Sequence, residues 1–198
     1  MKSHSKKDRT ISTSQLRIVG GQWRSRKLAF AEVDGLRPTA DRIRETLFNW
    51  LAPHIQGARV LDVFSGSGAM LFEAMSRGAA SSLGLESSRS AQRCIEQNLK
   101  LLNCNNAQII CTDALNYLAA PASNNFDIVL LDPPFYQGLL EPACQLLEEN
   151  GWLADNALIY LETELPREQF RLPENWQQLR AKHSGQLHYG LWQRKRRN

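Results

Sequence analysis

From residue 59 onward, short apolar segments alternate with helical segments, and this alternation constrains the fold more than any other feature of the chain. The apolar segments predict strands at 59–64, 81–86, 107–111, 126–131 and 157–162. The segments between them predict helices at about 69–77, 88–102, 114–119 and 138–149. Alternating strands and helices imply a parallel sheet with right-handed crossovers and helices on both faces.

The alternation changes after the fifth predicted strand. Residues 176–182 and 186–194, joined by Ser184-Gly185, predict an antiparallel pair. The expected fold class is therefore α/β, with a doubly wound, mostly parallel, seven-stranded sheet that ends in a C-terminal antiparallel hairpin. At 198 residues the chain is long enough for one such domain around a single core.

The N-terminal region predicts a separate small element. Residues 16–19 and 23–30 are expected to form a hairpin around a Gly20-Gly21 turn. A helix is expected to begin at the capping residue Thr39 and to end before Pro53. The expected organisation is a disordered basic tail over 1–14, a basic hairpin over 15–36 and one α/β domain over 37–198.

The net charge of +4 is unevenly distributed. Residues 1–47 hold 11 Lys/Arg against 5 Asp/Glu, residues 48–193 hold 9 against 15, and residues 194–197 add four positive charges. Basic ends on an acidic body favour an anionic polymer as partner, and nucleic acid is the commonest. For residues 1–14 taken alone, a solubilising disordered tail is the alternative.

Several functional classes are disfavoured by what the sequence lacks. There is no run of 18 apolar residues and no hydrophobic segment at the N-terminus, so we expect neither a membrane span nor a secretory signal, and a cytoplasmic location. The four cysteines form no Cys-x-x-Cys pair, which argues against a zinc site and a disulfide framework. His54, His183 and His188 have no ligand spacing, and no metal is expected.

The first strand of the predicted sheet runs into a glycine loop that opens a helix, in the segment VLDVFSGSGAM. Gly66 and Gly68 permit positive φ and allow a ligand to approach the backbone. A dinucleotide-binding loop requires a third glycine three residues after Gly68, and that position is Leu71. Glu86, at the end of the second strand, can accept hydrogen bonds from ribose hydroxyls, and this suits NAD and S-adenosylmethionine equally.

Acidic residues recur at the ends of successive predicted strands. Asp62 precedes the glycine loop, where it can accept bonds from loop N–H groups or, through water, from the amino group of a methionine moiety. Asp113 ends the third strand and can bind an adenine amine, cap the following helix, or do both. Together with Glu86 and Asp132, these side chains are expected to point into one cleft.

The fourth strand stops abruptly at Asp132, Pro133, Pro134 and Phe135. Proline lacks the N–H that a sheet requires, and two successive prolines fix two φ angles. The result is a stiff loop that presents one carboxylate, one aromatic ring and backbone carbonyls. The alternative is a rigid turn with a core phenylalanine.

These motifs carry a resemblance to a known family. The order of VLDVFSGSG, GLE, TD and DPPF resembles the Rossmann-like class I S-adenosylmethionine methyltransferases that modify exocyclic amino nitrogens. LRIVGGQWRSRKL, LRPTADRIRETLFNWL and LDPPF together resemble the bacterial 16S rRNA guanine-N2 methyltransferase family, over residues 16–194. DPPF alone indicates only amino methylation, since adenine-N6, cytosine-N4 and glutamine-N5 enzymes share it.

The resemblance implies roles for three groups of residues. The catalytic loop would be Asp132, Pro133, Pro134 and Phe135. S-adenosylmethionine would be bound by Asp62, Phe64, Ser65, Gly66, Gly68, Glu86, Asp113 and Ala114, with Thr39, Arg42 and Phe48 packing over it. The nucleic-acid contacts would be Arg17, Arg24, Arg26, Lys27, Arg37 and Arg44, and the alternative for these cations is a solvated basic face.

The implied activity is methyl transfer to guanine N2 of 16S rRNA, in the 30S subunit or an assembly intermediate, by a monomer. Adenine-N6 or cytosine-N4 methylation of DNA or other RNA is the enzymatic alternative. A non-catalytic RNA-binding protein and a nicotinamide oxidoreductase are further alternatives, and Leu71 and DPPF disfavour the second. Only about 45 residues lie outside the sheet domain, which favours a structured RNA over DNA.

Overall fold

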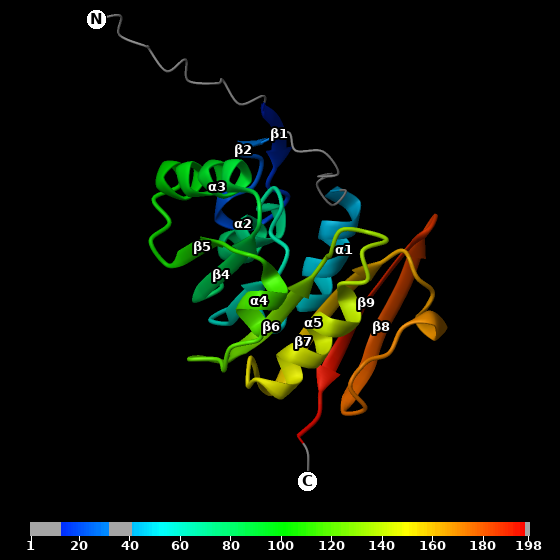
Figure 1. Ribbon diagram of the computed structural model, residues 1–198. Helices are drawn as coiled ribbons and strands as arrows, with labels where there is room; N and C mark the ends of the chain where they lie inside the picture. The colour runs from blue at the N-terminus through cyan, green and yellow to red at the C-terminus, as the bar shows by residue number, and fades with distance from the viewer. Residues whose placement is uncertain (1–12, 32–40, 197–198) are drawn as a thin grey trace, which may run out of the picture.

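The computed structural model of the protein describes residues 13–31 and 41–196, and its elements follow the predicted order (Figure 1). The strands are β1 Thr13–Arg17, β2 Lys27–Ala31, β3 Arg59–Asp62, β4 Ser81–Glu86, β5 Ala107–Cys111, β6 Phe126–Leu131, β7 Leu153–Thr163, β8 Trp176–Ser184 and β9 Leu187–Arg194. The helices are α1 Asp41–Leu51, α2 Ala69–Ser76, α3 Arg89–Leu101, α4 Ala114–Leu118 and α5 Leu140–Glu149, with short 3-10 turns η1 Gly21–Trp23 and η2 Arg167–Gln169.

The seven-stranded sheet predicted from the sequence is confirmed. Its strand order is β5-β4-β3-β6-β7-β9-β8. The first five strands are parallel, and β9 pairs antiparallel with both β7 and β8. In the sheet, β4 and β5 therefore lie on one side of β3, and β6 and β7 lie on the other side.

The central strands are apolar on both faces because helices cover both. Along β6, Ile128 and Leu130 lie in the same apolar cluster as residues of α1, α2 and α3, whereas Val129 and Leu131 lie in the cluster that contains α4 and α5. Side chains of a strand alternate between faces, so a continuous apolar run fills two cores. The sheet is a middle layer between helices (Figure 1).

The N-terminal hairpin differs from the prediction in its turn. We predicted a two-residue turn at Gly20-Gly21, but β1 and β2 are joined by a longer segment that contains η1. The N–H of Ser25 donates to the carbonyl of Ile18 at 2.8 Å, and the N–H of Ile18 donates to the carbonyl of Arg26 at 3.0 Å. These bonds continue the pairing beyond the strands, which leaves Arg24 and Arg26 on the connecting segment.

The hairpin is fastened to helices of the α/β domain. The N–H of Val19 donates to Oε2 of the buried Glu73 at 3.0 Å, and the N–H of Trp23 donates to Oγ of Ser76 at 2.9 Å. Nδ2 of Asn98 on α3 donates to the carbonyl of Ala29 at 2.7 Å. Backbone groups that would otherwise be exposed at the base of the hairpin thus bind side chains of α2 and α3.

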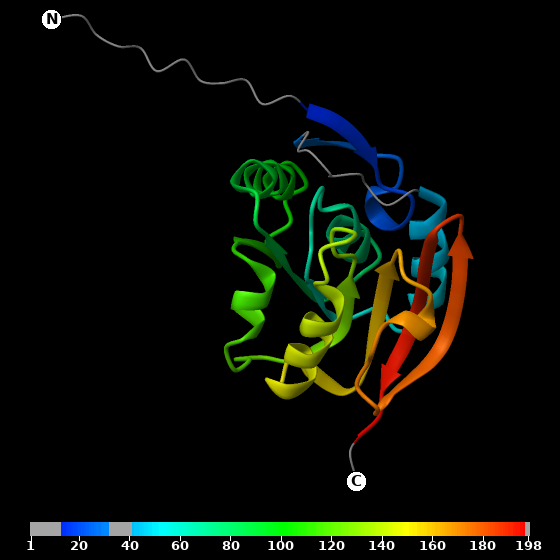
Figure 2. The same cartoon turned by 45° about the vertical axis from the view of Figure 1, so that its right-hand side comes forward.

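The hairpin lies at the end of the molecule toward which β6 and β7 point (Figure 2). Because the two strands are parallel, their carboxyl ends share this edge of the sheet. The hairpin and the loops after these strands are therefore on the same side of the protein.

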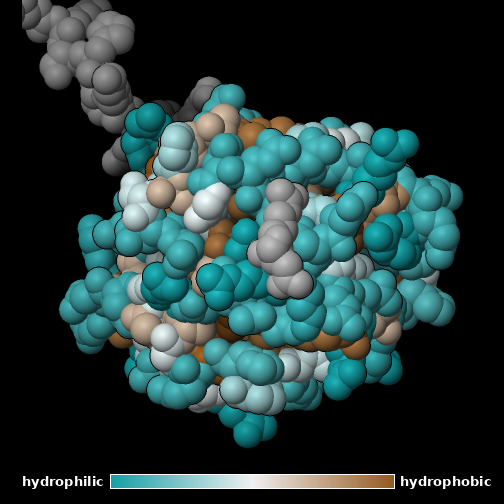
Figure 3. All heavy atoms as spheres, turned by 90° about the horizontal axis from the view of Figure 1, so that it is seen from below, coloured by the Kyte–Doolittle hydropathy of each residue, from teal (hydrophilic) through white to brown (hydrophobic). Residues whose placement is uncertain are grey.

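The surface that the structure describes shows few large apolar side chains. Those that are exposed are Leu101, Phe135, Tyr136 and Leu179. Seen from below, the surface is mostly hydrophilic, with narrow apolar strips (Figure 3). Among the helices within 13–31 and 41–196, none has the length and apolar character needed to cross a membrane.

Candidate active site

The strand order reverses between β3 and β6. From β3 the sheet continues to β4 and β5, and from β6 it continues to β7. In open α/β sheets, ligands bind outside the carboxyl ends of the strands where this reversal occurs. Asp62 ends β3 and Asp132 follows β6, so two carboxylates lie at this point. Burial, followed by the charge of Asp132, raises the pKa of Asp62, so the two carboxylates are close enough to interact.

The loop of residues 64–68 joins β3 to α2 and contains two glycines in left-handed conformations. The φ angles are +52° at Gly66 and +78° at Gly68. The N–H of Ser65 donates to the carbonyl of Leu85 at 2.9 Å, and the N–H of Gly68 donates to the carbonyl of Ser65 at 2.7 Å. This glycine loop is therefore a tight turn held against β4, and it leads directly into the first turn of α2.

Gly84 on β4 is a part of the site that sequence analysis missed. A Cβ atom at this position would lie 2.4 Å from Oγ of Ser65 and 2.8 Å from a methyl carbon of Leu71. The glycine thus permits the glycine loop to approach the neighbouring strand. A glycine in the interior of a strand is the signal that could have identified it, because glycine there often marks a close backbone approach.

Asp62 is buried without a partner for its charge. Its side chain is only 1% exposed, and neither carboxylate oxygen has a hydrogen-bond partner within the described residues. Burial raises the pKa of Asp62 to about 7, and the charge of Asp132 adds to this rise. The nearby hydroxyl of Ser65 and N–H of Leu71 offset a part of it. A buried carboxylate at a strand end with unused acceptors is a ready site for a cationic group.

Glu86 braces the glycine loop from the end of β4. Its Oε2 accepts a hydrogen bond from the N–H of Gly66 at 2.8 Å, and its Oε1 accepts one from the N–H of Ser88 at 2.6 Å. Burial raises the pKa of Glu86, and the backbone donors partly offset this effect. A carboxylate offers about four lone-pair sites, so both oxygens retain capacity for ribose hydroxyls.

Asp113 caps α4, which begins at Ala114. Oδ1 of Asp113 accepts a hydrogen bond from the N–H of Asn116 at 2.8 Å. Of the two roles considered for Asp113, the structure shows the helix cap. Binding of an adenine amine stays a prediction, and the position of Asp113 just after β5 places it along the same carboxyl edge as Asp62 and Glu86.

The Asp-Pro-Pro-Phe loop follows β6 directly. Asp132 is half-buried and Pro133 is buried, whereas Pro134 and Phe135 are exposed. Phe135 is therefore not the core phenylalanine of the alternative interpretation, since 40% of its surface is exposed. The loop holds a carboxylate at the crevice and directs an aromatic ring to the surface beside it.

Tyr136, which sequence analysis did not single out, extends this aromatic surface. It is 78% exposed, and its ring lies edge-on to Phe135 with centroids 6.3 Å apart. Its φ of +61° is unfavourable for a residue with a side chain. The N–H of Tyr136 donates to Oε1 of Glu164 at 2.7 Å, and this bond helps to hold the conformation.

Comparisons with known proteins agree with this geometry. The model of the family described as Conserved hypothetical protein 95 matches residues 16–193. The Ribosomal RNA small subunit methyltransferase D of Escherichia coli K12 is 48% identical over 189 residues, which are 96% of this chain and 95% of that protein. The chain belongs to the ribosomal RNA small subunit methyltransferase D family.

A second relative and a solved structure have comparable similarity to this chain. The Haemophilus influenzae protein of the same name is 45% identical and covers 90% of this chain and 94% of its own length. The solved structure of the yhhF protein of Escherichia coli is 49% identical, has a TM-score of 0.86 and covers 92% of this chain and 99% of its own. The match thus extends over the hairpin, the sheet and the C-terminal strands.

The cofactor of this methyltransferase D family protein is S-adenosylmethionine. The residues present fit it, because the unpaired buried carboxylate of Asp62 can receive a cationic methionine amino group, and Glu86 can accept from ribose hydroxyls. Within residues 13–31 and 41–196, no group of three or more His, Cys, Asp or Glu side chains is arranged to hold a metal ion.

The prediction that Arg44 contacts nucleic acid is wrong. Its side chain is 1% exposed, so it cannot reach a phosphate. Its guanidinium donates to the backbone carbonyl of Arg17 and to Oδ1 of Asp41 at 2.8 Å. Arg44 therefore fastens α1 to the hairpin. The helical pattern around Arg44 does not predict that its guanidinium binds a backbone carbonyl 27 residues away in the sequence.

The prediction that Phe48 contacts the cofactor is also wrong. Phe48 is fully buried among the apolar residues of the core, and the guanidinium of Arg77 lies over its ring at 5.2 Å from the centroid. Arg42 is exposed on the first turn of α1, and its cofactor contact stays a prediction. Thr39 and Arg37 lie outside the described residues.

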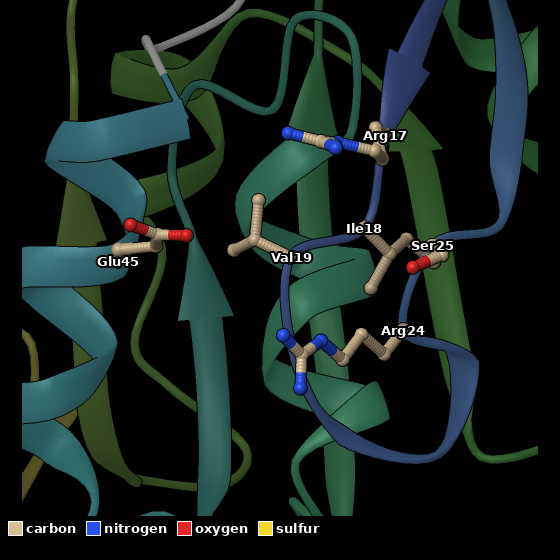
Figure 4. A pocket seen from close by; sticks show the side chains of 6 residues that line it. All are labelled: Arg17, Ile18, Val19, Arg24, Ser25 and Glu45. Carbon is tan, nitrogen blue, oxygen red and sulfur yellow. The ribbon is translucent and has the colours of Figure 1, made fainter.

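The remaining basic candidates are exposed on the hairpin. Arg24, Arg26 and Lys27 are exposed, and Arg17 is 58% exposed and pairs with Asp41 at 3.0 Å. A cavity of about 90 Å³ between this hairpin and α1 is lined by Arg17, Ile18, Val19, Arg24, Ser25 and Glu45 (Figure 4). None of its lining residues belongs to the glycine loop or to the Asp-Pro-Pro-Phe loop, so it is separate from the cofactor crevice.

Replacement of Glu86 by alanine is expected to weaken S-adenosylmethionine binding by about 10- to 100-fold. The reason is the loss of hydrogen bonds to a charged acceptor, each worth roughly 1.5 to 3 kcal/mol. Glu86→Gln should lose less, because its carbonyl still accepts one bond. Calorimetric titration of folded variants measures both affinities. Wild-type affinity in the alanine variant would exclude Glu86 from the cofactor site.

Proposed function

We propose that this protein transfers a methyl group from S-adenosylmethionine to the exocyclic N2 of a specific guanine in 16S rRNA of the small ribosomal subunit. The observation that carries the proposal is the rigid loop after β6, which presents Asp132 at the cofactor crevice beside the exposed ring of Phe135. The family supports rRNA as the substrate, since the relatives are named small-subunit rRNA methyltransferases.

The loop after β6 can make the amine of the substrate a better nucleophile. The lone pair of guanine N2 is delocalised into the ring, so the amine is a poor nucleophile. Its nucleophilicity increases when its N–H bonds are held by acceptors that disfavour the planar form. The carboxylate of Asp132 and the carbonyl of Pro133 are the proposed acceptors, and the two fixed φ angles of the prolines keep them aimed at one amine.

The chain's contribution to the reaction is alignment and electrostatics. When bound, S-adenosylmethionine supplies a methyl group that its sulfonium charge already activates. The residues at the ends of β3, β4 and β5 hold the cofactor, and the loop after β6 orients the amine for in-line attack. A carboxylate with a usual pKa of about 3.9 is too weak a base to deprotonate a neutral aryl amine. The amine therefore loses its proton after methyl transfer, with Asp132 as the nearest acceptor.

Phe135 and Tyr136 supply the surface for the target base. Base–aromatic stacking is worth about 1 to 3 kcal/mol per base and tolerates any base. A guanine taken out of its helix or loop can lie against Phe135, while the edge-on ring of Tyr136 lies beside it. Specificity for guanine then depends on the acceptors that its amino group meets.

Arg17, Arg24, Arg26 and Lys27 are the proposed phosphate contacts. They are exposed on the hairpin, which lies beyond the carboxyl ends of β6 and β7 (Figure 2). Phosphate contacts of this kind position an RNA and carry little base specificity.

Replacement of Arg24, Arg26 and Lys27 together by alanine is expected to raise KM for RNA and leave S-adenosylmethionine affinity unchanged. The salt dependence of RNA binding should flatten by up to about 0.7 to 0.9 log units for each phosphate that the variant no longer neutralises. A matched control replaces three exposed cations elsewhere, Arg93, Lys100 and Arg171. Equal salt slopes for the hairpin variant and the wild type, measured on folded proteins, would show that RNA docks elsewhere.

The nature of the methylated base tests the proposed function directly. The protein is incubated with methyl-labelled S-adenosylmethionine and small-subunit particles or rRNA from cells that lack the enzyme. Digestion to nucleosides and mass spectrometry should give N2-methylguanosine. N6-methyladenosine or N4-methylcytidine would support the enzymatic alternative, and cofactor binding without turnover on any RNA would support a binding protein.

A further inference from the structure

Glu162 lies next to Asp132 although 30 positions separate them in the chain. Strands β6 and β7 pair in parallel with Leu131 opposite Leu161, so the following residues of the two strands, Asp132 and Glu162, are neighbours. Glu162 is only 3% exposed, whereas Asp132 is half-buried at the crevice. A second carboxyl group therefore lies directly behind the proposed catalytic one.

Glu162 has two polar neighbours. The hydroxyl of Tyr160, on the same face of β7, donates to Oε1 of Glu162 at 2.6 Å. The side chain of Glu162 is also within reach of that of Asp132, so that the two carboxyl groups can share a hydrogen bond. Two carboxyl groups can share such a bond only when one of them carries a proton, because an ionised carboxylate is an acceptor only.

Glu162 is the more deeply buried of the two carboxyl groups, so burial favours the proton on Glu162. Burial, followed by the charge of Asp132, raises the pKa of Glu162 well above its usual range. The titratable groups that face Glu162 within the described residues are Asp132 at the end of β6, Tyr160 on β7 and Tyr189, its register partner on β9. Burial and the neighbouring Glu162 also raise the pKa of Tyr160, so that its hydroxyl remains a donor.

We propose that Glu162 is a positioning residue that, as a neutral acid, donates a hydrogen bond to Asp132 and holds that carboxylate ionised and aimed at the target amine. Tyr160 in turn fixes the orientation of Glu162. A donor to the ionised form of Asp132 keeps Asp132 ionised at lower pH. This inference rests on the proposed role of Asp132 as the acceptor of the amine.

The test compares Glu162→Gln with Glu162→Leu. Glutamine reproduces the neutral acid, since its amide N–H donates to Asp132 and its carbonyl accepts from Tyr160. Its kcat should stay within about threefold of the wild type, whereas leucine should lower kcat by about 100-fold, the cost of a misaligned catalytic group. S-adenosylmethionine affinity should be unchanged in both variants.

The pH profile provides a readout that a purely structural role would not move. The acidic limb of kcat reports protonation of Asp132. Loss of the Glu162 donor should shift this limb to higher pH in Glu162→Leu, and Glu162→Gln should keep the wild-type limb. If the leucine variant does not fold, Tyr160→Phe replaces it, and its kcat should fall by about tenfold because Glu162 loses its orientation.

Three results would overturn the proposal. The first is a kcat of Glu162→Gln as low as that of the leucine or phenylalanine variant. The second is a wild-type kcat in Glu162→Leu or Tyr160→Phe. The third is an acidic limb of the kcat profile that lies at the same pH in every folded variant. Nucleoside analysis of the product separates this outcome from failure of the proposed function. If the methylated base is not guanine, the relative rates of the Glu162 variants still report on its action through Asp132.

Discussion

Replacement of Asp132 by alanine is expected to abolish methyl transfer while S-adenosylmethionine still binds. Asp132 follows β6 on one side of the crevice, and the glycine loop and Glu86 lie on the other side, at the ends of β3 and β4. Without its carboxylate, the amine of the substrate keeps its planar form and its alignment is lost. The rate of transfer should fall by about 1,000-fold, at the upper end of the loss caused by removing one preorganised electrostatic group.

Single-turnover measurement of methyl transfer, with cofactor affinity from calorimetry, checks this expectation. Asp132→Asn is the matched variant, because its carbonyl still accepts one hydrogen bond but carries no charge. Its rate should lie between those of the alanine variant and the wild type. Transfer at the wild-type rate in Asp132→Ala would refute the assigned role of the loop after β6.

Replacement of Asp62 by asparagine is expected to stabilise the cofactor-free protein and to weaken S-adenosylmethionine binding by about 100-fold or more. The pKa of Asp62 is about 7 in the folded state, compared with 3.8 for an unperturbed side chain. The folded state thus favours the neutral acid. This contribution to stability is fully present below pH 3.8, and it is lost as the pH rises through 7.

The size of this loss follows from the pKa difference. Three units correspond to on the order of 4 kcal/mol of unfolding free energy. Asparagine does not ionise, so at about pH 8 the cofactor-free variant should have a higher free energy of unfolding than the wild type, and at about pH 4 this gain should be absent. Urea titrations at both pH values measure it. A gain that is the same at both would show that Asp62 is not a buried charge at neutral pH.

The fold was predictable because its pattern is local. Each central strand is a short apolar run and each helix has its own period, so the seven-stranded sheet and its topology class could be read from the chain. The acidic residues at the strand ends were also predictable as a set, because parallel strands end at one edge. The residue contacts of the cofactor and the RNA stay predictions.

The misinterpreted residues depend on partners far away in the chain. Arg44 was predicted to contact nucleic acid, and its burial is explained by its hydrogen bonds to the backbone of Arg17 and to Asp41. Phe48 belongs to the core rather than to the crevice. Glu162 also ends a predicted strand, but it was not counted with the other acids, because its burial beside Asp132 arises from the pairing of β6 with β7.

Helix α2 sets a fixed distance between the glycine loop and the hairpin. It begins at Ala69, directly after Gly68 of the glycine loop, and its second half carries Glu73 and Ser76, which bind the backbone of the hairpin. Its eight residues span about 12 Å at 1.5 Å per residue. This helix therefore fixes the spacing between the hairpin and the glycine loop. An RNA whose phosphates dock on the hairpin would be measured against this length, and the enzyme would select its target base by distance along the folded RNA as well as by base identity.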